Sequence, residues 1–446
     1  MLITHAKLIT WGTPNQVLSD HAVYIKDGRI ADLGATGDLL IRYPDATQID
    51  ARGQLVMPGN ICAHTHFYGA YARGMAIPGP SPKDFPEILK RLWWPLDKAL
   101  DKDSVRMSAL VSLVDAIKHG TTTLIDHHAS PNFTSGSLRV LEEAVEQSGL
   151  RAVLCYEVSD RDGQEKLEAG IAENVDFLGL EHSSRVAGAF GLHASLTLGD
   201  NALRAVADAI PAGVGFHIHV AEHEADEEDS LLRSGKRVVD RLNEYGIWRS
   251  KTIAAHCVHI NDNERQLLAE KQVWITHQPR SNMNNAVGAM AFDSMMEREM
   301  QICIGNDGFS NNMWADWKDA YLLHKVASRD PRKANGADIV KAGVYNNAGL
   351  ARQFFPTLGL GEITVGAAAD IIFVDYHPFT PLHEGNLPWH ILFGFESSMV
   401  TTTIVEGRVL MEDRKLLTLD EAEIAREALT LAPHVWERYV ANVNAI

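Results

Sequence analysis

Two histidines separated by one residue, His64 and His66, follow an apolar, strand-like run that ends at Cys62. On a β-strand, side chains two positions apart point to the same face. Two imidazoles from one rigid strand can therefore bind the same metal ion, and imidazole suits zinc or iron. Such a pair is a weak signal by itself. The hypothesis of a metal site therefore depends on further ligands at the ends of later strands.

Three later stretches place histidines and acidic residues at the ends of apolar, strand-like runs. They are Phe216–Glu222, which contains His219; Ile253–His259, which contains His256; and Ile304–Gly308, which contains Asp307. The chain has 20 histidines, and a random scatter would not favour strand ends in this way. The alternative of ordinary hydrogen-bonded core histidines therefore fails for the set, although it stays open for single members.

The middle of the chain alternates short β-rich runs with helical patterns such as Ser104–His119 and Leu138–Ser148. Such alternation predicts βα units around a parallel sheet. The eight predicted strands are Leu55–His66, Thr121–His128, Leu150–Glu157, Val186–His193, Val214–His219, Thr252–His256, Val273–His277 and Ile302–Asp307. Eight βα units predict a (β/α)8 TIM barrel, in which catalytic groups lie at the C-terminal ends of the strands.

Both chain ends have the pattern of short strands and turns. Asp27-Gly28 between two strand-like runs predicts a hairpin, and residues 369–375 and 403–410 predict strands near the other end. Neither end alone has enough strands to bury a core, so we expect the two to form one small β-sandwich domain. The expected division is 1–57 plus 357–446 for this composite β domain and 58–356 for the barrel.

Composition excludes some classes of protein. The 446 residues carry a formal net charge of −17 without a visible basic patch, which argues against a nucleic-acid partner. No apolar run reaches the ~18 residues of a membrane helix, and no signal-peptide pattern begins the chain. None of the four cysteines forms a CxxC pair, which favours buried, reduced thiols. We expect a cytoplasmic protein, and a homo-oligomer because oligomers are common for such folds.

Taken in order, the motifs of this chain are PG-x4-HTH, HVAE, AAHCVH, HQPRSN and NDG. In this combination the chain resembles the amidohydrolase superfamily, and within it the mononuclear-metal branch of cytosine, guanine and adenosine-type deaminases and triazine hydrolases. The resemblance covers nearly the whole chain, including the divided β domain. Within the branch, the chain looks most similar to the SsnA-type aminohydrolases, with which it shares Leu92–Trp94, Ile125–Pro131 and Arg280–Asn285.

The resemblance implies one metal site. The residues that match its ligands are His64, His66, His219 and Asp307. No strand-end lysine stands where a bridging lysine would serve a second metal, so one divalent ion, zinc or iron, is expected. Such an ion lowers the pKa of a bound water toward ~7. Asp307 would then accept the water's proton, His256 would orient the nucleophile, and Glu222 would move a proton to the ring nitrogen and the leaving amine.

Substrate contacts are expected from three strand-end or loop positions. His193 matches a substrate-contacting histidine of related deaminases, with a core role as the alternative. Trp93 can stack on a flat heterocycle, or it can lie half in the core. One of His127 and His128 should face the barrel interior because neighbours on a strand alternate. His128 is named as the candidate substrate contact, while which of the two faces the pocket stays open.

Arg280 is the fourth expected substrate contact, and it replaces a small residue of the related deaminases' motif. It could bind a carbonyl or carboxylate of the substrate. Equally, it could pair with the acidic run Glu222–Asp229, which apart from Glu222 is expected to be a solvated helix face.

The predicted function is a metal-dependent hydrolase, a deaminase of a small-molecule heterocycle such as an aminated purine, pteridine or pyrimidine. The alternative enzyme removes chloride or an alkylamine from a triazine. A third hypothesis, a barrel that has lost catalysis, predicts substitutions among the ligands, and the sequence has none. The substrate itself stays open because specificity lies in the loops after the strands.

Overall fold

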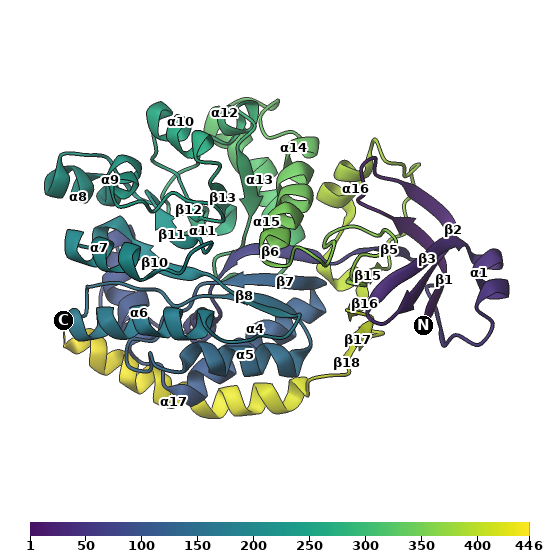
Figure 1. Cartoon of the computed structure of the whole chain (residues 1–446), viewed down its shortest axis with the longest axis horizontal. Coiled ribbons are helices and arrows are strands. Elements are labelled where there is room, and N and C mark those ends of the chain that lie inside the picture. Colours follow the sequence, from purple (N-terminus) through teal and green to yellow (C-terminus); the bar gives the residue numbers. More distant parts are fainter. Residues whose placement is uncertain (446) are drawn as a thin grey trace.

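The computed structural model describes residues 1–445 and consists of a barrel surrounded by helices with a smaller β domain beside it (Figure 1). Within these residues the predicted eight-stranded parallel arrangement is present. Its strands are β6 (Asn60–Thr65), β7 (Thr121–Asp126), β8 (Arg151–Leu154), β9 (Val186–Gly188), β10 (Phe190–Ala194), β11 (Phe216–Val220), β12 (Ile253–His256), β13 (Trp274–His277) and β14 (Gln301–Ile304). The fourth predicted strand is divided into β9 and β10.

Neighbouring strands pair in parallel in two ladders, one in the order β6-β7-β8-β9 and the other in the order β10-β11-β12-β13-β14. Ala189 is the residue between β9 and β10, and its N–H donates to the carbonyl of Leu154, at the end of β8, at 3.0 Å. At the other seam, the N–H groups of Asn306 and Asp307 donate to the His64 carbonyl at 2.9 and 3.1 Å. The strands therefore close on themselves, and the predicted (β/α)8 barrel is confirmed.

Helices cover the outside of the barrel. They are α4 (Lys102–Lys118), α5 (Ser137–Ser148), α6 (Gln164–Leu178), α7 (Asp200–Ala209), α8 (Glu224–Ser234), α9 (Val238–Glu244), α10 (Asp262–Glu270), α11 (Pro279–Asn284), α12 (Phe292–Glu297), α13 (Met313–Ser328), α14 (Gly336–Val340), η4 (Lys341–Asn346) and α15 (Asn347–Phe354), with the short η3 (Ser195–Thr197) after β10. Two of them, α4 and α5, match the helices predicted from periodicity. Gly149 ends α5 in the left-handed conformation, with φ of 84°.

Strands from both chain ends form one continuous sheet, which is nine-stranded within the described residues. The strands are β1 (Leu2–Ile9), β2 (Val17–Lys26), β3 (Arg29–Ala35), β4 (Gln48–Asp50), β5 (Leu55–Pro58), β15 (Ile371–Val374), β16 (Val400–Val405), β17 (Arg408–Glu412) and β18 (Lys415–Leu416); the helices beside them are α1 (Thr36–Arg42), α16 (Leu387–Gly394) and η5 (Ser397–Met399). The predicted Asp27-Gly28 turn joins β2 to β3 with positive φ at both residues. Pairing of β5 with β15 unites the two chain ends, as predicted.

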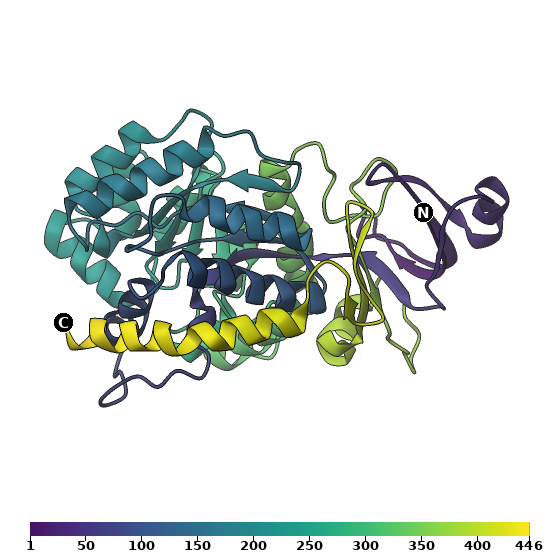
Figure 2. The same ribbon diagram turned by 90° about the horizontal axis from the view of Figure 1, so that it is seen from below.

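Two segments outside the βα repeat are important for the site. Between β6 and α4 the chain forms η1 (Phe67–Ala72), α2 (Phe85–Ile88), the π-helical η2 (Leu89–Trp93) and α3 (Trp94–Asp97). The last helix, α17 (Glu421–Asn444), leaves the β domain and packs along α4 and α3 (Figure 2). It belongs by position to the range 357–446 that the sequence assigned to the β domain, yet the structure places it on the barrel.

Two expectations from composition can be compared with the structure. Among residues 1–445, no helix combines the length and the apolar character that a membrane span requires. The four cysteines are buried and free. Burial raises the pKa of the Cys62 thiol to about 12, so this side chain is an uncharged core group.

Candidate active site

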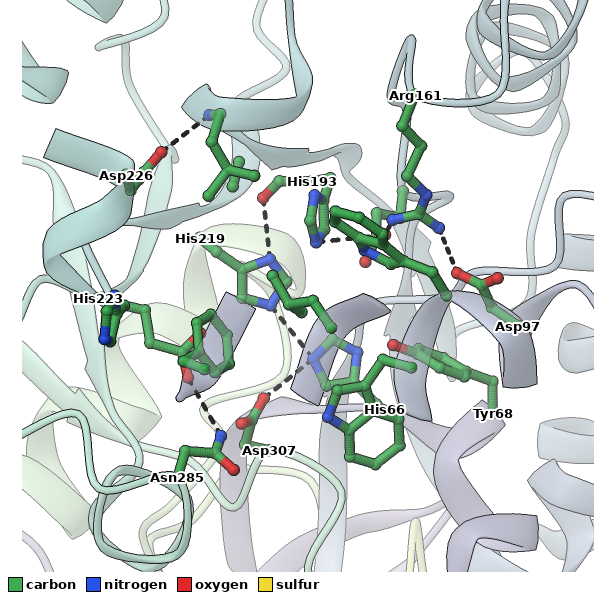
Figure 3. A pocket seen from close by; sticks show the side chains of 18 residues that line it. His66, Tyr68, Asp97, Arg161, His193, His219, His223, Asp226, Asn285 and Asp307 are labelled. Carbon is green, nitrogen blue, oxygen red and sulfur yellow. Dashed lines mark hydrogen bonds and ion pairs between the residues drawn. The ribbon is translucent and has the colours of Figure 1, made fainter. Parts of the chain in front are cut away.

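The four side chains predicted as metal ligands converge at the C-terminal end of the barrel strands. The Nε2 atoms of His64 and His66 each lie 3.0 Å from Asp307 Oδ1. The His219 Nε2 lies 3.2 Å from the His66 Nε2. Figure 3 shows His66, His219 and Asp307 turned toward one another. Ligand atoms at about 2.0–2.2 Å from one tetrahedral zinc are about 3.3 Å apart, so this donor set fits a divalent metal.

The orientation of His66 and His219 is set through the other ring nitrogen. Nδ1 of His66 lies 2.6 Å from the His127 carbonyl, and Nδ1 of His219 lies 2.9 Å from the His193 carbonyl. A carbonyl oxygen can only accept, so each Nδ1 carries the hydrogen. The lone pair of each Nε2 is therefore free to bind a metal.

His64 is held deeper in the barrel. Its Nδ1 lies 2.8 Å from Nε2 of His217, a buried histidine one layer below the site. Burial lowers the pKa of His64 to about 3, which keeps the ring neutral. Neutral imidazole is the form that binds a metal.

The backbone around the site is held in the left-handed region at three strand ends. Ala221, His256 and Asp307 have φ values of 44°, 72° and 54°. Such non-glycine positions cost roughly 1–3 kcal/mol each and persist where the surroundings over-determine them. Gly305 permits this arrangement at β14, because a Cβ there would lie 2.6 Å from the His64 carbonyl oxygen. The close contact lets the Asp307 N–H reach that carbonyl and turns the carboxylate into the site.

Glu222 and His256 lie beside the donor set. His256 Nδ1 is 2.8 Å from Asn282 Oδ1, while its buried Nε2 has no hydrogen-bond partner among the described residues. This Nε2 lies 3.4 Å from Glu222 Oε2 and 3.9 Å from Asp307 Oδ2. Burial and the nearby Asp307 carboxylate raise the pKa of Glu222 well above its usual range. An unsatisfied buried nitrogen between two carboxylates indicates the position of a reacting group or water.

The donor set opens into a pocket that occupies about 700 Å³ when the solvent at its open mouth is included. Aromatic and apolar side chains from the segment between β6 and α4 form one wall. They are Tyr68, Phe85, Leu89, Trp93 and Trp94. Such a wall suits a flat, apolar ring system.

A charged group forms another part of the lining (Figure 3). The Arg161 guanidinium donates to Glu157 Oε1 at 3.1 Å, forms an ion pair with Asp97, and stacks over Trp94. Burial raises the pKa of Asp97 to about 8, although Arg161 favours its charged form. Asp97 Oδ1 is buried and has no partner within residues 1–445. This oxygen is therefore available to a polar group of a substrate.

A model described as the amidohydrolase family matches residues 55–410 of the chain. The chain belongs to the amidohydrolase family. The 5′-deoxyadenosine deaminase of Methanosarcina acetivorans is 31% identical to it, over 100% of this chain and 99% of that protein. The 5-methylthioadenosine/S-adenosylhomocysteine deaminase of Thermococcus sibiricus is 33% identical, over 87% and 89%. The superfamily named from the sequence motifs is thereby confirmed.

Solved structures share the fold of this amidohydrolase. An adenosine deaminase from Xanthomonas campestris with bound zinc matches with a TM-score of 0.83 at 23% identity, covering 100% of this chain and 98% of the other. The atrazine chlorohydrolase TrzN from Arthrobacter aurescens, complexed with zinc, matches with a TM-score of 0.81 at 21% identity, covering 97% and 100%. At these identities the likeness supports the barrel and its β domain.

Two of the four predicted substrate contacts of this amidohydrolase, Trp93 and His193, line the pocket. His128 does not. The residue is fully buried behind Tyr68, and its Nε2 lies 2.8 Å from Ser130 Oγ. Its neighbour His127 faces the barrel interior instead, with Nε2 against the carbonyls of Leu192 and His217. The prediction of His128 as a substrate contact was therefore wrong, because strand alternation turns it away from the barrel axis.

The expectations for Arg280 also need correction. Its guanidinium donates to both carboxylate oxygens of Asp316 on α13, at 3.0 and 2.5 Å, and to the side chain and carbonyl of Ser310. It does not line the pocket, and its partner is not the acidic run after Glu222. Arg280 therefore joins the start of α11 to α13.

Replacing Arg280 with methionine should destabilise the protein by about 3 kcal/mol, because the buried Asp316 carboxylate loses its partner. KM should change little, since Arg280 does not reach the pocket. Chemical unfolding and steady-state kinetics measure the two effects. The double variant Arg280→Met/Asp316→Leu is the control and should recover much of the stability. A large rise in KM at unchanged stability would contradict this prediction and would indicate that Arg280 contacts the substrate.

The acidic run after Glu222 is not simply a solvated face. Asp226 is buried and accepts the N–H groups of Ala221 and Leu196 at 2.9 and 2.8 Å. Glu227 is buried too, and it accepts the Val238 N–H at 3.1 Å. Asp226 therefore fixes the turn that carries Glu222. The run looks uniformly charged, so the sequence alone gives no signal for this role.

The charged group made by Asp97, Glu157 and Arg161 was likewise not predicted from the sequence. Glu157 had a usable signal, since it ends the third predicted strand, where a barrel places functional groups. Asp97 ends the short helix α3 and Arg161 lies in a turn 64 positions later, and no local pattern connects them.

Proposed function

We propose that this amidohydrolase is a zinc-dependent deaminase that acts on the adenine ring of a nucleoside without a phosphate group. The predicted class, a metal-dependent hydrolase acting on a C–N bond of an aminated heterocycle, is confirmed by the family and by deaminases that match over 87% to 100% of the chain. The narrower choice of an adenine nucleoside and of zinc is our inference. It rests on the pocket and on the names of the similar proteins.

The observation that carries the proposal is the position of Glu222. Its carboxyl lies beside the histidine–aspartate donor set without belonging to it, and burial and the nearby Asp307 carboxylate raise its pKa well above the usual range, which favours the protonated form. In this place it can protonate the ring nitrogen next to the amino-bearing carbon. Asn285 donates to Glu222 Oε1 at 3.3 Å and orients the carboxyl.

The two oxygens of Asp307 have different surroundings. Oδ1 faces the Nε2 atoms of His64 and His66, whereas Oδ2 accepts a hydrogen bond from Ser281 Oγ at 2.5 Å. We assign Oδ1 to the metal and Oδ2 to the proton of the attacking water. A bound zinc ion would supply Lewis acidity, which lowers the pKa of that water toward ~7.

Proton and bond changes then balance around the substrate. Protonation of the ring nitrogen by Glu222 makes the neighbouring carbon electrophilic, and water adds to it. As the water adds, Asp307 Oδ2 accepts one of its protons. Glu222, now ionised, takes the remaining hydroxyl proton of the adduct and transfers it to the amino group, so the C–N bond breaks, ammonia leaves and the C–O bond becomes a carbonyl. The proton on Asp307 then restores the protonated Glu222. His256 Nδ1 donates to Asn282 Oδ1, so Nε2 of the neutral ring, unpaired and 3.4 Å from Glu222, is placed to accept a hydrogen bond from the water that adds and to orient it.

The lining favours an uncharged nucleoside. Trp93 and Trp94 provide aromatic surface for the base, and Asp97 and Glu157 can accept hydrogen bonds from sugar hydroxyls. The cation of the lining, Arg161, is already paired with these two carboxylates. A phosphate would therefore meet acidic groups without a free cation.

The test is ammonia release from purified, zinc-loaded protein offered adenosine, 5′-deoxyadenosine, 5′-methylthioadenosine and adenosine monophosphate in parallel. Turnover is expected for nucleosides and should be weak or absent for the monophosphate. A chlorinated triazine assayed for chloride release addresses the alternative reaction. Chloride release without ammonia release from any adenine nucleoside would overturn the proposal.

Three finer predictions from the sequence remain predictions. They are the membership of the SsnA-type group, the cytoplasmic location and the homo-oligomeric state.

A further inference from the structure

The aromatic wall of the pocket comes from a segment that is not part of the barrel. The segment from Phe67 to Asp97 contains short helical pieces, including the π-helical η2, and a stretch without helix at 73–84. Short π-helical turns are less regular than α-helix and occur often at functional sites. Such a wall needs support from outside the segment to keep a fixed shape.

Pro95 removes one of the segment's own hydrogen bonds. In a continuous α-helix the N–H of residue 95 would donate to the carbonyl of Arg91, but proline has no N–H. The Tyr439 hydroxyl from α17 donates to this carbonyl at 2.6 Å. The Tyr439 side chain is fully buried, so the bond is shielded from water.

Further side chains of α17 bind carbonyls of the same region. In a continuous helix the Ala99 N–H would donate to the Pro95 carbonyl, but here it donates to the Leu96 carbonyl instead. The side-chain amide of Asn442 donates to the Pro95 carbonyl at 2.9 Å. The Arg438 Nε donates to the Ala99 carbonyl at 2.6 Å. The Trp436 indole donates to the carbonyl of Tyr71 at 3.0 Å.

The acceptors alternate with the residues that line the pocket. Trp93 and Trp94 lie between Arg91 and Pro95, and Asp97 lies between Pro95 and Ala99. One side of the segment is thus hydrogen-bonded to α17, while the side chains of Trp93, Trp94 and Asp97 face the pocket. Figure 2 shows α17 extending from the β domain along the barrel to this end of the molecule.

We propose that α17 is a positioning element for substrate binding, in which Tyr439 and Asn442 hold the wall that carries Trp93, Trp94 and Asp97. The role in substrate affinity rests on the proposed function, whereas the support of the wall does not. Neither residue reaches the donor set or Glu222. Their loss should therefore weaken substrate binding and leave the chemical step and metal binding intact.

The test uses Tyr439→Phe and Asn442→Leu in the full-length, zinc-loaded protein. Tyr439→Phe keeps the buried ring and removes only the hydroxyl, so the helix should stay in place. Thr430→Val is the matched control, because it removes an exposed hydroxyl that bonds only to Arg426 within α17. Amide hydrogen exchange over residues 91–99 is measured without substrate, and kcat and KM are measured with the nucleoside that is turned over.

Each variant is expected to speed amide exchange in residues 91–99 and to leave kcat and zinc content unchanged. KM should rise about fivefold, the change in affinity that the loss of one hydrogen bond implies. Thr430→Val should match the unaltered protein. Amide exchange can be measured whether or not the protein is active. Faster exchange in a protein that is inactive on all adenine nucleosides would therefore support the role of α17 in holding the wall and would refute the proposed substrate class. Unchanged exchange in both variants would overturn the proposal, and so would faster exchange with an unchanged KM or a change confined to kcat.

Discussion

Glu222→Gln is expected to lower kcat by about 10²–10⁴-fold, the usual contribution of a positioned general acid–base. Glutamine has nearly the same shape and can still receive the hydrogen bond from Asn285, but it cannot transfer a proton. Zinc content and the unfolding midpoint should stay near those of the unaltered protein, because Glu222 lies outside the donor set. Single-turnover kinetics with a zinc-loaded sample measures the loss directly.

Glu224→Gln is the control for this variant. Glu224 stands two positions further on, and its side chain is 74% exposed, so the same change of charge should leave kcat unaltered. If Glu222→Gln kept full turnover, another group would have to move the proton. The mechanism proposed here would then be wrong even if adenine nucleosides proved to be the substrates.

The second large effect concerns the metal. His219→Ala removes an Nε2 that lies 3.2 Å from His66 Nε2, and we expect loss of both bound zinc and turnover. The unaltered protein should be stabilised by zinc, by about 2.7 kcal/mol at a free concentration 100 times the Kd, whereas the variant should gain little. Metal analysis and thermal unfolding with and without zinc measure these outcomes.

His434→Ala is the control, since this histidine is on the exposed side of α17 and should affect neither zinc binding nor turnover. Removal of zinc with a chelator should abolish activity of the unaltered protein, and added zinc should restore it. A His219→Ala protein that bound one zinc per chain with unchanged affinity would contradict the assigned donor set.

The barrel and the candidate metal site could be predicted because their signals are local. Each predicted strand is an apolar run of a few residues, and HxH spacing places His64 and His66 on one face whatever surrounds them. A barrel brings the ends of all its strands together, so His219, His256 and Asp307 could be placed near that pair without knowledge of their contacts. The pairing of the two chain ends in one β domain could also be predicted, because neither end has enough strands to bury a core alone.

The contacts around that site depend on residues that are far apart in the chain. Arg280 and Asp316 are 36 positions apart, and Arg161 and Asp97 are 64 apart, so no periodicity connects a charge to its partner. For this reason the sequence predicted either the substrate or the acidic run Glu222–Asp229 as the partner of Arg280, and it predicted a solvated Asp226. His128 was misassigned because alternation states that one of two neighbours faces inward but not which one.

By itself, the sequence determined which side chains could bind a metal and move a proton, since these depend on residue type and spacing along single strands. Only the tertiary structure decided what forms the pocket around them. The charged lining of Asp97, Glu157 and Arg161 and the support of Trp93 and Trp94 by α17 require segments up to 348 positions apart to meet. Such contacts arise from packing of the whole chain, and the local pattern of residues does not encode them.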